Sequence, residues 1–210
     1  MHSPAFEEHD ENLSQRLAQG DRDALSLLLS RNRDRLKRMV MLRMSPALLK
    51  RMDGSDVIQE AFLQAAVHAE TYQHDEERPF YLWIRKIVEN KLLEMQRHHL
   101  RAKRDMQREV GQPTGRAQVS ADSLAGFLIE SSGSGPLSKV MRLELRAAVQ
   151  EAIEAMDPVD REVLVLRHFE QLSLSEIADV LGISKSGAAK RHRVAVKRIH
   201  NVMESRAEQL

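Results

Sequence analysis

The sequence contains no cysteine and few aromatic residues, and these absences exclude several classes of protein. Without cysteine the chain can form no disulfide, no thiolate nucleophile and no cysteine-bound zinc. No apolar run approaches the length of about 20 residues that a membrane-spanning helix requires, so we expect no membrane insertion. The N-terminal stretch MHSPAFEEHDEN is acidic and contains no apolar signal core. The protein is therefore expected to be cytoplasmic.

Sequence typical of β-strands is also scarce, which favours an all-α fold. Aromatic residues make up 4% of the chain, and few segments alternate apolar and polar positions. With 210 residues and 42% hydrophobic content, the chain can bury a core in one domain or in two small ones. We expect two small helical domains joined by a flexible linker. The predicted divisions are a loose tail at 1–12, an N-terminal domain at 13–105, a linker at 106–136 and a C-terminal domain at 137–205.

The net charge is only +1, yet the cations are gathered in two segments. Residues 81–104 contain seven Lys and Arg against two Glu, and residues 184–200 contain six against no acidic residue. Residues 137–183 contain five cations against nine anions. Two basic segments separated by an acidic one indicate two contacts with nucleic acid and a different partner elsewhere.

Residues 173–199 have the pattern of two helices joined by a tight turn. Ser173 and Glu176 form a predicted capping box at the start of the first helix. Gly182 stands where a left-handed residue would end that helix, and Ser184 can cap the second one. This pattern is typical of a helix-turn-helix, whose second helix enters the major groove of DNA.

The second of these helices is strongly basic, which favours binding to a DNA duplex. A lone basic helix is more often a solvated surface, but the preceding turn makes DNA binding the favoured interpretation here. The cations of this helix are Lys185, Lys190, Arg191, Arg193, Lys197 and Arg198.

Half of the aromatic residues lie around one polar loop, residues 73–78. Tyr72 precedes the loop, and Phe80, Tyr81 and Trp83 follow it at the start of a basic helix. One interpretation is a small aromatic cluster in the core. The other is a platform on which unpaired bases stack, at about 1–3 kcal/mol per base. The residues alone leave both interpretations open.

An amphipathic helix is predicted before this loop, capped by Asp53 or Ser55. Its polar side carries Asp56, Gln59 and Glu60, which are three and four residues apart and so share one face. Taken alone, these side chains are ordinary helix surface, with an acidic first turn that complements the helix dipole.

Three segments, in this order, resemble the bacterial extracytoplasmic-function (ECF) sigma factors of the sigma-70 family. They are SDVIQEAFLQA, RPFYLWIRKIVENKLLEMQRHHLRAKRD and DPVDREVLVLRHFEQLSLSEIADVLGIS. The resemblance implies a protein that binds the core of RNA polymerase, opens the promoter −10 element and reads the −35 element. It implies promoter DNA as a partner, both as duplex and as melted non-template strand, and an anti-sigma factor as a further candidate partner.

The resemblance also assigns roles to individual residues. Asp56, Gln59 and Glu60 match the positions that dock on a coiled coil of the polymerase, and loop 74–78 matches the segment that captures a flipped base. Among single residues it matches Trp83 and Asn90 to the −10 segment, and Lys185, Ser186, Lys190, Arg191 and Arg193 to the −35 helix. With the aromatic and basic residues around them, the candidates for the −10 element are Tyr72, His74, Phe80, Tyr81, Trp83, Arg85, Lys86, Asn90, Lys91, Arg97 and Arg101. The candidates for the −35 element are Ser184, Lys185, Ser186, Lys190, Arg191, Arg193 and Lys197.

Two other functions were weighed against this resemblance. A repressor or activator could use the helix-turn-helix without docking on polymerase, but a protein that binds only duplex DNA does not need the aromatic and basic segment 72–104. An enzyme is disfavoured because the sequence has no nucleophile motif and no phosphate-cradling glycine loop. The nine histidines show no recognisable ligand spacing, so we expect no cofactor and no metal site.

Overall fold

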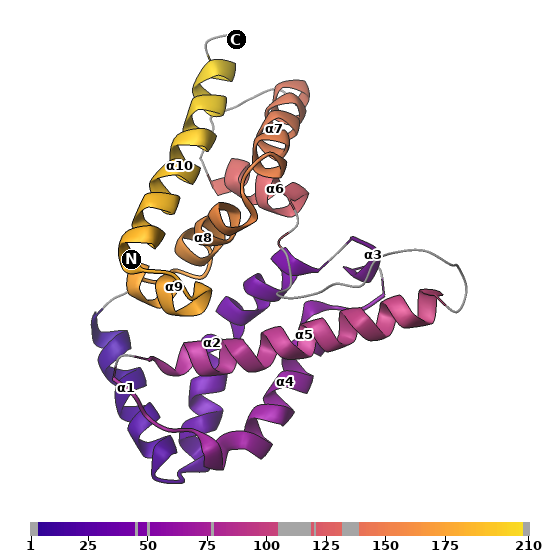
Figure 1. Cartoon of the computed structure of the whole chain (residues 1–210). Coiled ribbons are helices and arrows are strands. Elements are labelled where there is room, and N and C mark those ends of the chain that lie inside the picture. Colours follow the sequence, from indigo (N-terminus) through magenta and orange to yellow (C-terminus); the bar gives the residue numbers. More distant parts are fainter. Residues whose placement is uncertain are drawn as a thin grey trace. The chain divides into compact units, whose positions relative to one another are not determined.

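The computed structural model describes residues 4–44, 46–49, 51–76, 78–104, 119, 121–131 and 139–207. Within these ranges every regular element is a helix, and the only β-type pairing is an isolated bridge between Asp75 and Arg78. The all-α prediction is thereby confirmed. The chain divides into two compact units, an N-terminal unit, Met1–Ala117, and a C-terminal unit, Gln118–Leu210. Figure 1 labels the helices of both.

The N-terminal unit is built around a long helix, α2, which packs on α1, α4 and α5. Its core is mainly aliphatic, with Leu28, Leu36, Met39, Ile58 and Leu92 almost completely buried. The elements are α1 (Pro4–Ala18), α2 (Arg22–Arg43), α3 (Pro46–Leu49), α4 (Gly54–His68), the 3-10 turn η1 (Ala69–Thr71) and α5 (Phe80–Arg104).

The caps of this unit follow the sequence. The Asp21 side chain accepts hydrogen bonds from the backbone N–H groups of Asp23 (2.9 Å) and Ala24 (3.3 Å) at the start of α2. Asp53 caps α4 in a capping box with Asp56, so of the two predicted capping residues Asp53 fills the role. These caps fix where α2 and α4 begin.

The prediction of a loose tail at 1–12 is wrong from Pro4 onward. Helix α1 begins there, and its later turns place Leu13 and Leu17 in the core. Asp10 also forms an ion pair with Arg31 of α2, with 2.7 Å between Oδ1 and Nη1. The acidic sequence alone does not predict this helix, because the contacts that stabilise it are made with residues distant in the sequence. Residues 1–3 lie outside the described part.

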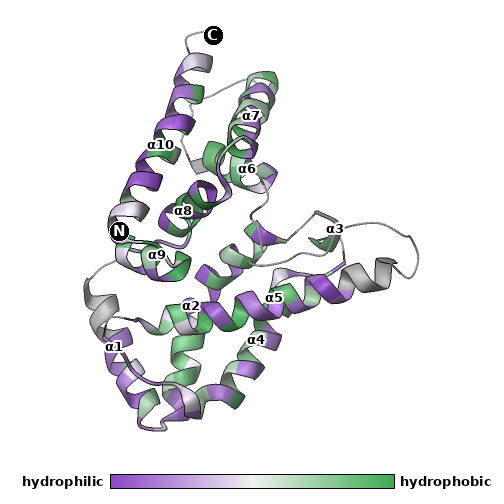
Figure 2. Ribbon diagram, in the orientation of Figure 1, coloured by the Kyte–Doolittle hydropathy of each residue, from purple (hydrophilic) through white to green (hydrophobic). Residues whose placement is uncertain are grey.

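The C-terminal unit consists of shorter helices around α10. This helix packs on α7, α8 and α9, and Ile153, Leu166 and Leu172 are fully buried beside it in the unit's core. Figure 2 shows hydrophobic and hydrophilic residues alternating along the helices, as expected of amphipathic elements. The elements are α6 (Ala121–Ser131), α7 (Lys139–Glu154), α8 (Pro158–His168), α9 (Leu174–Leu181) and α10 (Lys185–Ala207).

The predicted linker at 106–136 contains one of these helices, and here the prediction needs correction. Helix α6 packs on α7 and buries Leu124, Ala125 and Ile129. The ring of Phe127 lies 4.2 Å from that of Phe169, centroid to centroid. The C-terminal unit therefore begins before residue 137, because the short apolar patch in a Ser- and Gly-rich stretch is a docking face. The rest of the predicted linker, apart from Val119, lies outside the described residues.

Candidate nucleic-acid interface

Helices α9 and α10 have the caps and the turn that the sequence predicts. The Ser173 hydroxyl accepts from the Glu176 N–H at 3.2 Å, and the Glu176 carboxylate accepts from the Ser173 N–H at 2.6 Å. Gly182 ends α9 with φ of +67°, in the left-handed region. The Ser184 hydroxyl then accepts from the Gly187 N–H at 3.0 Å and caps α10. The turn therefore leaves the first residues of α10 exposed.

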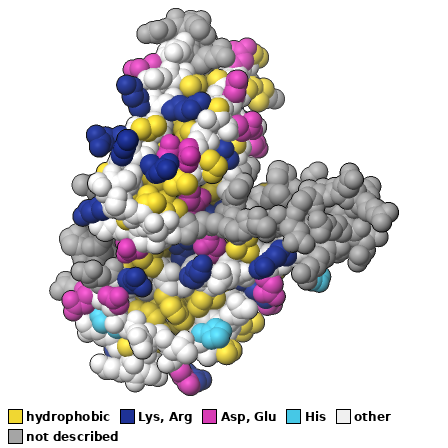
Figure 3. Space-filling model, viewed as in Figure 1, with side chains coloured by type: hydrophobic (Ala, Val, Ile, Leu, Met, Phe, Trp, Pro, Cys, Tyr) yellow, Lys and Arg dark blue, Asp and Glu magenta, His cyan; other side chains and the backbone are white. Residues whose placement is uncertain are grey.

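One face of α10 is packed and the other is basic. Ala188, Ala195 and Ile199 are buried against the unit. The opposite side carries Ser186, Lys190, Arg193 and Lys197, which are exposed and follow one another at helical spacing. We call these four residues the α10 stripe. Figure 3 shows several Lys and Arg side chains of the C-terminal unit gathered over this helix.

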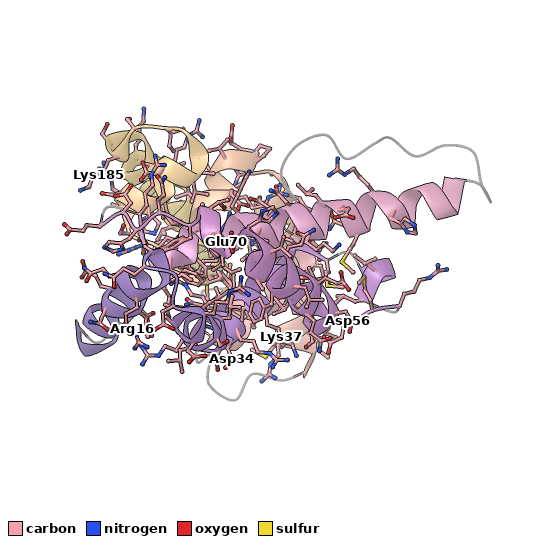
Figure 4. All side chains as sticks on the ribbon, turned by 90° about the horizontal axis from the view of Figure 1, so that it is seen from below. Arg16, Asp34, Lys37, Asp56, Glu70 and Lys185 are labelled. Atoms are coloured by element: carbon pink, nitrogen blue, oxygen red, sulfur yellow. The ribbon has the colours of Figure 1, made fainter. Side chains whose placement is uncertain are left out.

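Two further predicted residues lie at the start of the stripe. Ser184 and Lys185 are both exposed, and Figure 4 shows Lys185 at the outside of the unit. The hydroxyls of Ser184 and Ser186 lie 3.1 Å apart. The N-terminal turn of α10 thus presents polar groups and a cation, as a helix that enters a groove of DNA requires.

Arg191 is the exception among the predicted duplex contacts. Its Nη1 lies 2.6 Å from an Asp160 carboxylate oxygen and 3.2 Å from one of Asp157. The hydrogen bond to Asp160 raises the pKa of Arg191 above its ordinary value. Because Asp157 also caps α8, this ion pair ties α10 to the start of α8. The structure thus gives Arg191 a contact inside the unit, and its contact with DNA stays a prediction.

The packed side of α10 also carries His192, which meets His168 of α8. Their Nε2 atoms lie 2.9 Å apart and the rings stack at 5.1 Å between centroids. Burial lowers the pKa of both imidazoles, and the Coulombic influence of Arg167 lowers both further. This contact brings together two histidines that the sequence could not relate.

In the N-terminal unit the aromatic residues around loop 73–78 form a cluster in the core. Tyr72, Phe80 and Tyr81 are each buried. The ring centroids of Tyr72 and Trp83 lie 5.2 Å apart, and the Arg35 guanidinium lies 3.5 Å from the centre of the Tyr81 ring. The core interpretation is therefore the right one for these three residues, since a buried ring offers no face to a base.

Trp83 differs from the other three because it is only half-buried. It lies on the same face of α5 as Lys86, Asn90 and Arg97, which are all exposed. We call these four residues the α5 stripe. The aromatic ring offers a face on which an unpaired base can stack. The two cations and the amide beside it can bind the phosphates of a single strand.

Other predicted cations of α5 are engaged within the unit. Arg85 is buried, and its Nη1 lies 3.2 Å from Glu89 Oε2, so the prediction that it contacts DNA is not supported. Lys91 has only 13% of its side chain exposed and lies 3.5 Å from Glu60 and 3.4 Å from Glu94. The side chain of Arg101 lies outside the described residues. Only a part of the basic sequence of α5 is thus available to a ligand.

The predicted docking residues of α4 all face solvent. Asp56, labelled in Figure 4, is exposed, and its carboxylate accepts from the Asp53 N–H at 3.0 Å. Gln59 and Glu60 are exposed one turn later. Asp56 thus has a capping function of its own, whereas the Gln59 side chain forms no hydrogen bond within the described residues.

The same face of α4 continues with two residues that the sequence analysis missed. Leu63 and Val67 are 66% and 77% exposed, although both are apolar. They follow Gln59 by four and eight residues in the sequence, so they lie on the same face of the helix as Gln59. We call Asp56, Gln59, Glu60, Leu63 and Val67 together the α4 face. The signal was present, since an apolar residue on the polar side of a helix is informative.

The fold is all-helical, it contains a helix-turn-helix whose second helix is basic, and it carries a second basic stripe on α5. These features are typical of a DNA-binding protein that acts in transcription. The profile of the family described as ECF sigma factor matches residues 11–205. The chain belongs to this family, and is an RNA polymerase sigma factor that acts in transcription initiation.

Curated relatives support the same family. The chain is 27% identical over 194 residues to the ECF RNA polymerase sigma factor SigW of Bacillus subtilis (strain 168), covering 91% of each chain. It is 29% identical over 177 residues to the ECF RNA polymerase sigma-E factor of Escherichia coli (strain K12), covering 82% of each. The similarity therefore extends across both units.

A solved structure supports the fold. The structure of CnrH in complex with the cytosolic domain of CnrY matches 93% of this chain and 97% of that one, with a TM-score of 0.54 and 22% sequence identity. Among the described residues, none of the helices combines the length and hydrophobicity needed to cross a lipid bilayer.

Proposed function

We propose that this sigma factor divides its work between three surfaces. The α4 face docks on core RNA polymerase, the α5 stripe with loop 73–78 holds the melted −10 element, and the α10 stripe reads the −35 duplex. The observation that carries this proposal is that each unit has a helix with exposed cations along one face, the α5 stripe in one unit and the α10 stripe in the other. We expect the protein to work in the cytoplasm without catalysing a reaction itself.

The α10 stripe suits duplex DNA for a geometric reason. Exposed cations and a hydroxyl lie along one face of a helix whose other face is fully packed, so the helix can enter a major groove without repacking. Arg193 can pair with the edge of a guanine, while Lys190 and Lys197 suit phosphates. Ser186 and the start of the helix add hydrogen-bonding groups to the same contact.

The α5 stripe suits unpaired DNA because it offers stacking as well as charge. The exposed part of Trp83 can stack on a base, and Lys86 and Arg97 can neutralise phosphates along the same face. The buried rings of Tyr72 and Phe80 pack against Trp83 and so fix its position. The base-capturing role then falls to loop 73–78 and Trp83, with the buried rings as their scaffold.

The α4 face suits a protein partner more than nucleic acid. Its two carboxylates repel phosphates, whereas its exposed apolar residues need a surface to cover them. A basic helix of the polymerase core would match the acidic end of the face, and an apolar patch would match Leu63 and Val67. An anti-sigma factor remains a predicted partner, which co-purification from the native host would test.

A run-off transcription assay tests the proposal as a whole. Core polymerase and pooled promoter DNA are combined with and without this protein. Protein-dependent transcripts with aligned start sites are the expected result, and they would reveal both promoter elements. Retained duplex binding without transcripts would overturn the proposal and favour a repressor or activator that uses only the helix-turn-helix.

Variants of the α4 face separate docking from folding. Gln59→Ala combined with Glu60→Ala, and separately Leu63→Ser, are expected to weaken binding to core polymerase while circular dichroism shows unchanged helix content. Leu27→Ser is a matched control, since Leu27 is an exposed leucine on α2 in the same unit. Unchanged affinity in both α4 variants would exclude this face as the docking surface.

A further inference from the structure

Three potential metal ligands converge beside the loop that precedes α5. They are Glu11 on α1 and His74 and Glu76 in loop 73–78. One ligand atom from each residue lies within 4.8 Å of the other two. Glu11 lies more than 60 positions before the other two residues, so only the packing of α1 on the unit brings it to them.

His74 has an unusual environment. Both of its ring nitrogens are shielded from solvent, and neither has a hydrogen-bond partner within the described part of the chain. A neutral imidazole must carry a proton on one nitrogen and a lone pair on the other, so both atoms need a partner. Leaving a buried polar atom without one costs about 1–3 kcal/mol. A ligand bound to one of the two nitrogens would remove this cost for that nitrogen.

We propose that Glu11, His74 and Glu76 bind a divalent first-row transition metal ion, with Zn²⁺ as the ion of reference. An imidazole nitrogen with two carboxylates is a ligand set that Zn²⁺ and its neighbours accept, whereas Ca²⁺ and Mg²⁺ prefer oxygen ligands alone. Three protein ligands leave at least one coordination position for water. The two carboxylates neutralise the charge of the ion.

The site would act on the loop that the proposed function assigns to base capture, and this consequence rests on that proposal. Two of the ligands belong to the loop and the third belongs to α1, so a bound ion would fasten the loop to the helix bundle. The loop would then hold one conformation before DNA arrives. Metal occupancy would therefore change the stability of the open promoter complex and leave duplex recognition by α10 unchanged.

Cobalt titration of the tag-free, full-length protein tests the site directly. Co²⁺ serves as the probe because its visible absorption reports coordination by nitrogen and oxygen, and Zn²⁺ is then added as competitor. We expect saturable binding of one Co²⁺, displaced by Zn²⁺ and unaffected by excess Mg²⁺. Trp83, the only tryptophan, lies 5.2 Å from Tyr72 at the start of the loop, so its fluorescence gives a second readout.

Variants assign the binding to these residues. We expect a loss of Co²⁺ affinity of at least about tenfold in each of three variants, His74→Gln, Glu11→Gln and Glu76→Gln. Mutation of a residue that only hydrogen-bonds to a metal ligand already lowers metal affinity by that much. His68→Gln and Glu70→Gln are matched controls on neighbouring exposed positions and should bind like the wild type. Glu11 and Glu76 are exposed, so their variants remain informative if His74→Gln does not fold.

Absence of saturable binding by the wild type, or equal affinity in all three ligand variants, would overturn the proposal. Both results are independent of the transcription assay, because metal binding is measured without polymerase or DNA. Failure of transcription with intact metal binding would instead count against the proposed function alone.

Discussion

Helices α5 and α10 are both basic, but they use their cations differently. In α10 the cations of the stripe are exposed, and one arginine, Arg191, is held by carboxylates of α8. In α5 one arginine is buried and one lysine is nearly so, each beside a glutamate. The number of cations on a helix therefore does not measure its contact with nucleic acid. The face on which each cation lies decides its role.

The largest expected effect comes from the buried cation of α5. Arg85→Ala removes the guanidinium that lies 3.2 Å from the buried Glu89 carboxylate, and should lower the free energy of unfolding by about 3–5 kcal/mol. Thermal or urea unfolding measures this. The exposed neighbour variant Lys86→Ala should change stability by less than about 0.5 kcal/mol. The double variant Arg85→Met with Glu89→Leu should recover much of the loss, and equal stability of all variants would contradict the burial of the pair.

The exposed cations of α10 should affect DNA binding and leave stability unchanged. Arg193→Ala is expected to weaken binding to the −35 duplex by about 1–3 kcal/mol, as for an arginine that reads a guanine. Lys190→Ala should reduce the slope of log K against log salt by about one, as for a phosphate contact. Fluorescence anisotropy at several salt concentrations measures both. Arg142→Ala, an exposed arginine on α7, is the control and should bind normally.

Arg191 is a test of the comparison between α5 and α10, because it lies on the basic helix α10 but forms an ion pair with carboxylates of its own unit. Arg191→Ala should destabilise the protein by up to about 1 kcal/mol, since the pair is partly exposed. Its effect on duplex affinity should be smaller than that of Arg193→Ala. A larger loss of affinity than in Arg193→Ala, with unchanged stability, would show that Arg191 leaves its carboxylates to contact DNA.

The smallest expected effect is a dependence of stability on pH from His168 and His192. Their pKa values are lowered in the folded protein from the ordinary 6.5, so the unfolded chain takes up protons first as the pH falls. Stability should be full above pH 6.5 and decrease as the pH falls through it. The facing groups are the two imidazoles and the Arg167 guanidinium, and all repel an added proton.

Unfolding measured from about pH 8 to pH 5 checks this dependence. His192→Gln should flatten the curve. His200→Gln, on the same helix but paired with Glu204 at the surface, should leave the contribution of the histidine pair in place. The effect is expected to be modest because the histidine pair is partly exposed. A curve that is equally steep in His192→Gln would exclude the pair as its cause.

Local signals in the sequence were reliable, and long-range ones were not. The caps at Asp53 and Ser173 and the left-handed Gly182 were predictable because each depends on residues within one turn. Helix α6 was missed because its stability comes from α7 and from Phe169, not from its own composition. A short apolar patch gives little helical signal until its partner is known.

The same reason explains the errors in the candidate site. The sequence placed Tyr72, Phe80 and Tyr81 beside a basic helix but could not tell which side of α5 faces the core. The carboxylates that hold Arg191 lie 31 and 34 residues before it. The proximity of Glu11 to His74 likewise depends on the packing of α1. Burial and ion pairing are properties of the folded unit, so single residues could be assigned only after the fold was known.

The ion pair between Arg191 and the carboxylates at the start of α8 affects which positions of α10 can change when promoter preference changes. The residue that ties α10 to α8 is separate from the exposed α10 stripe that we propose contacts DNA, so positions 186, 190 and 193 can change without loosening the helix. Gly187 belongs to the fixed set, because a Cβ there would lie 3.0 Å from the Ser184 hydroxyl that caps the helix. A library randomised at 186, 190 and 193, with Gly187, Ala188 and Arg191 kept, is thus a starting point for building orthogonal regulators on this scaffold.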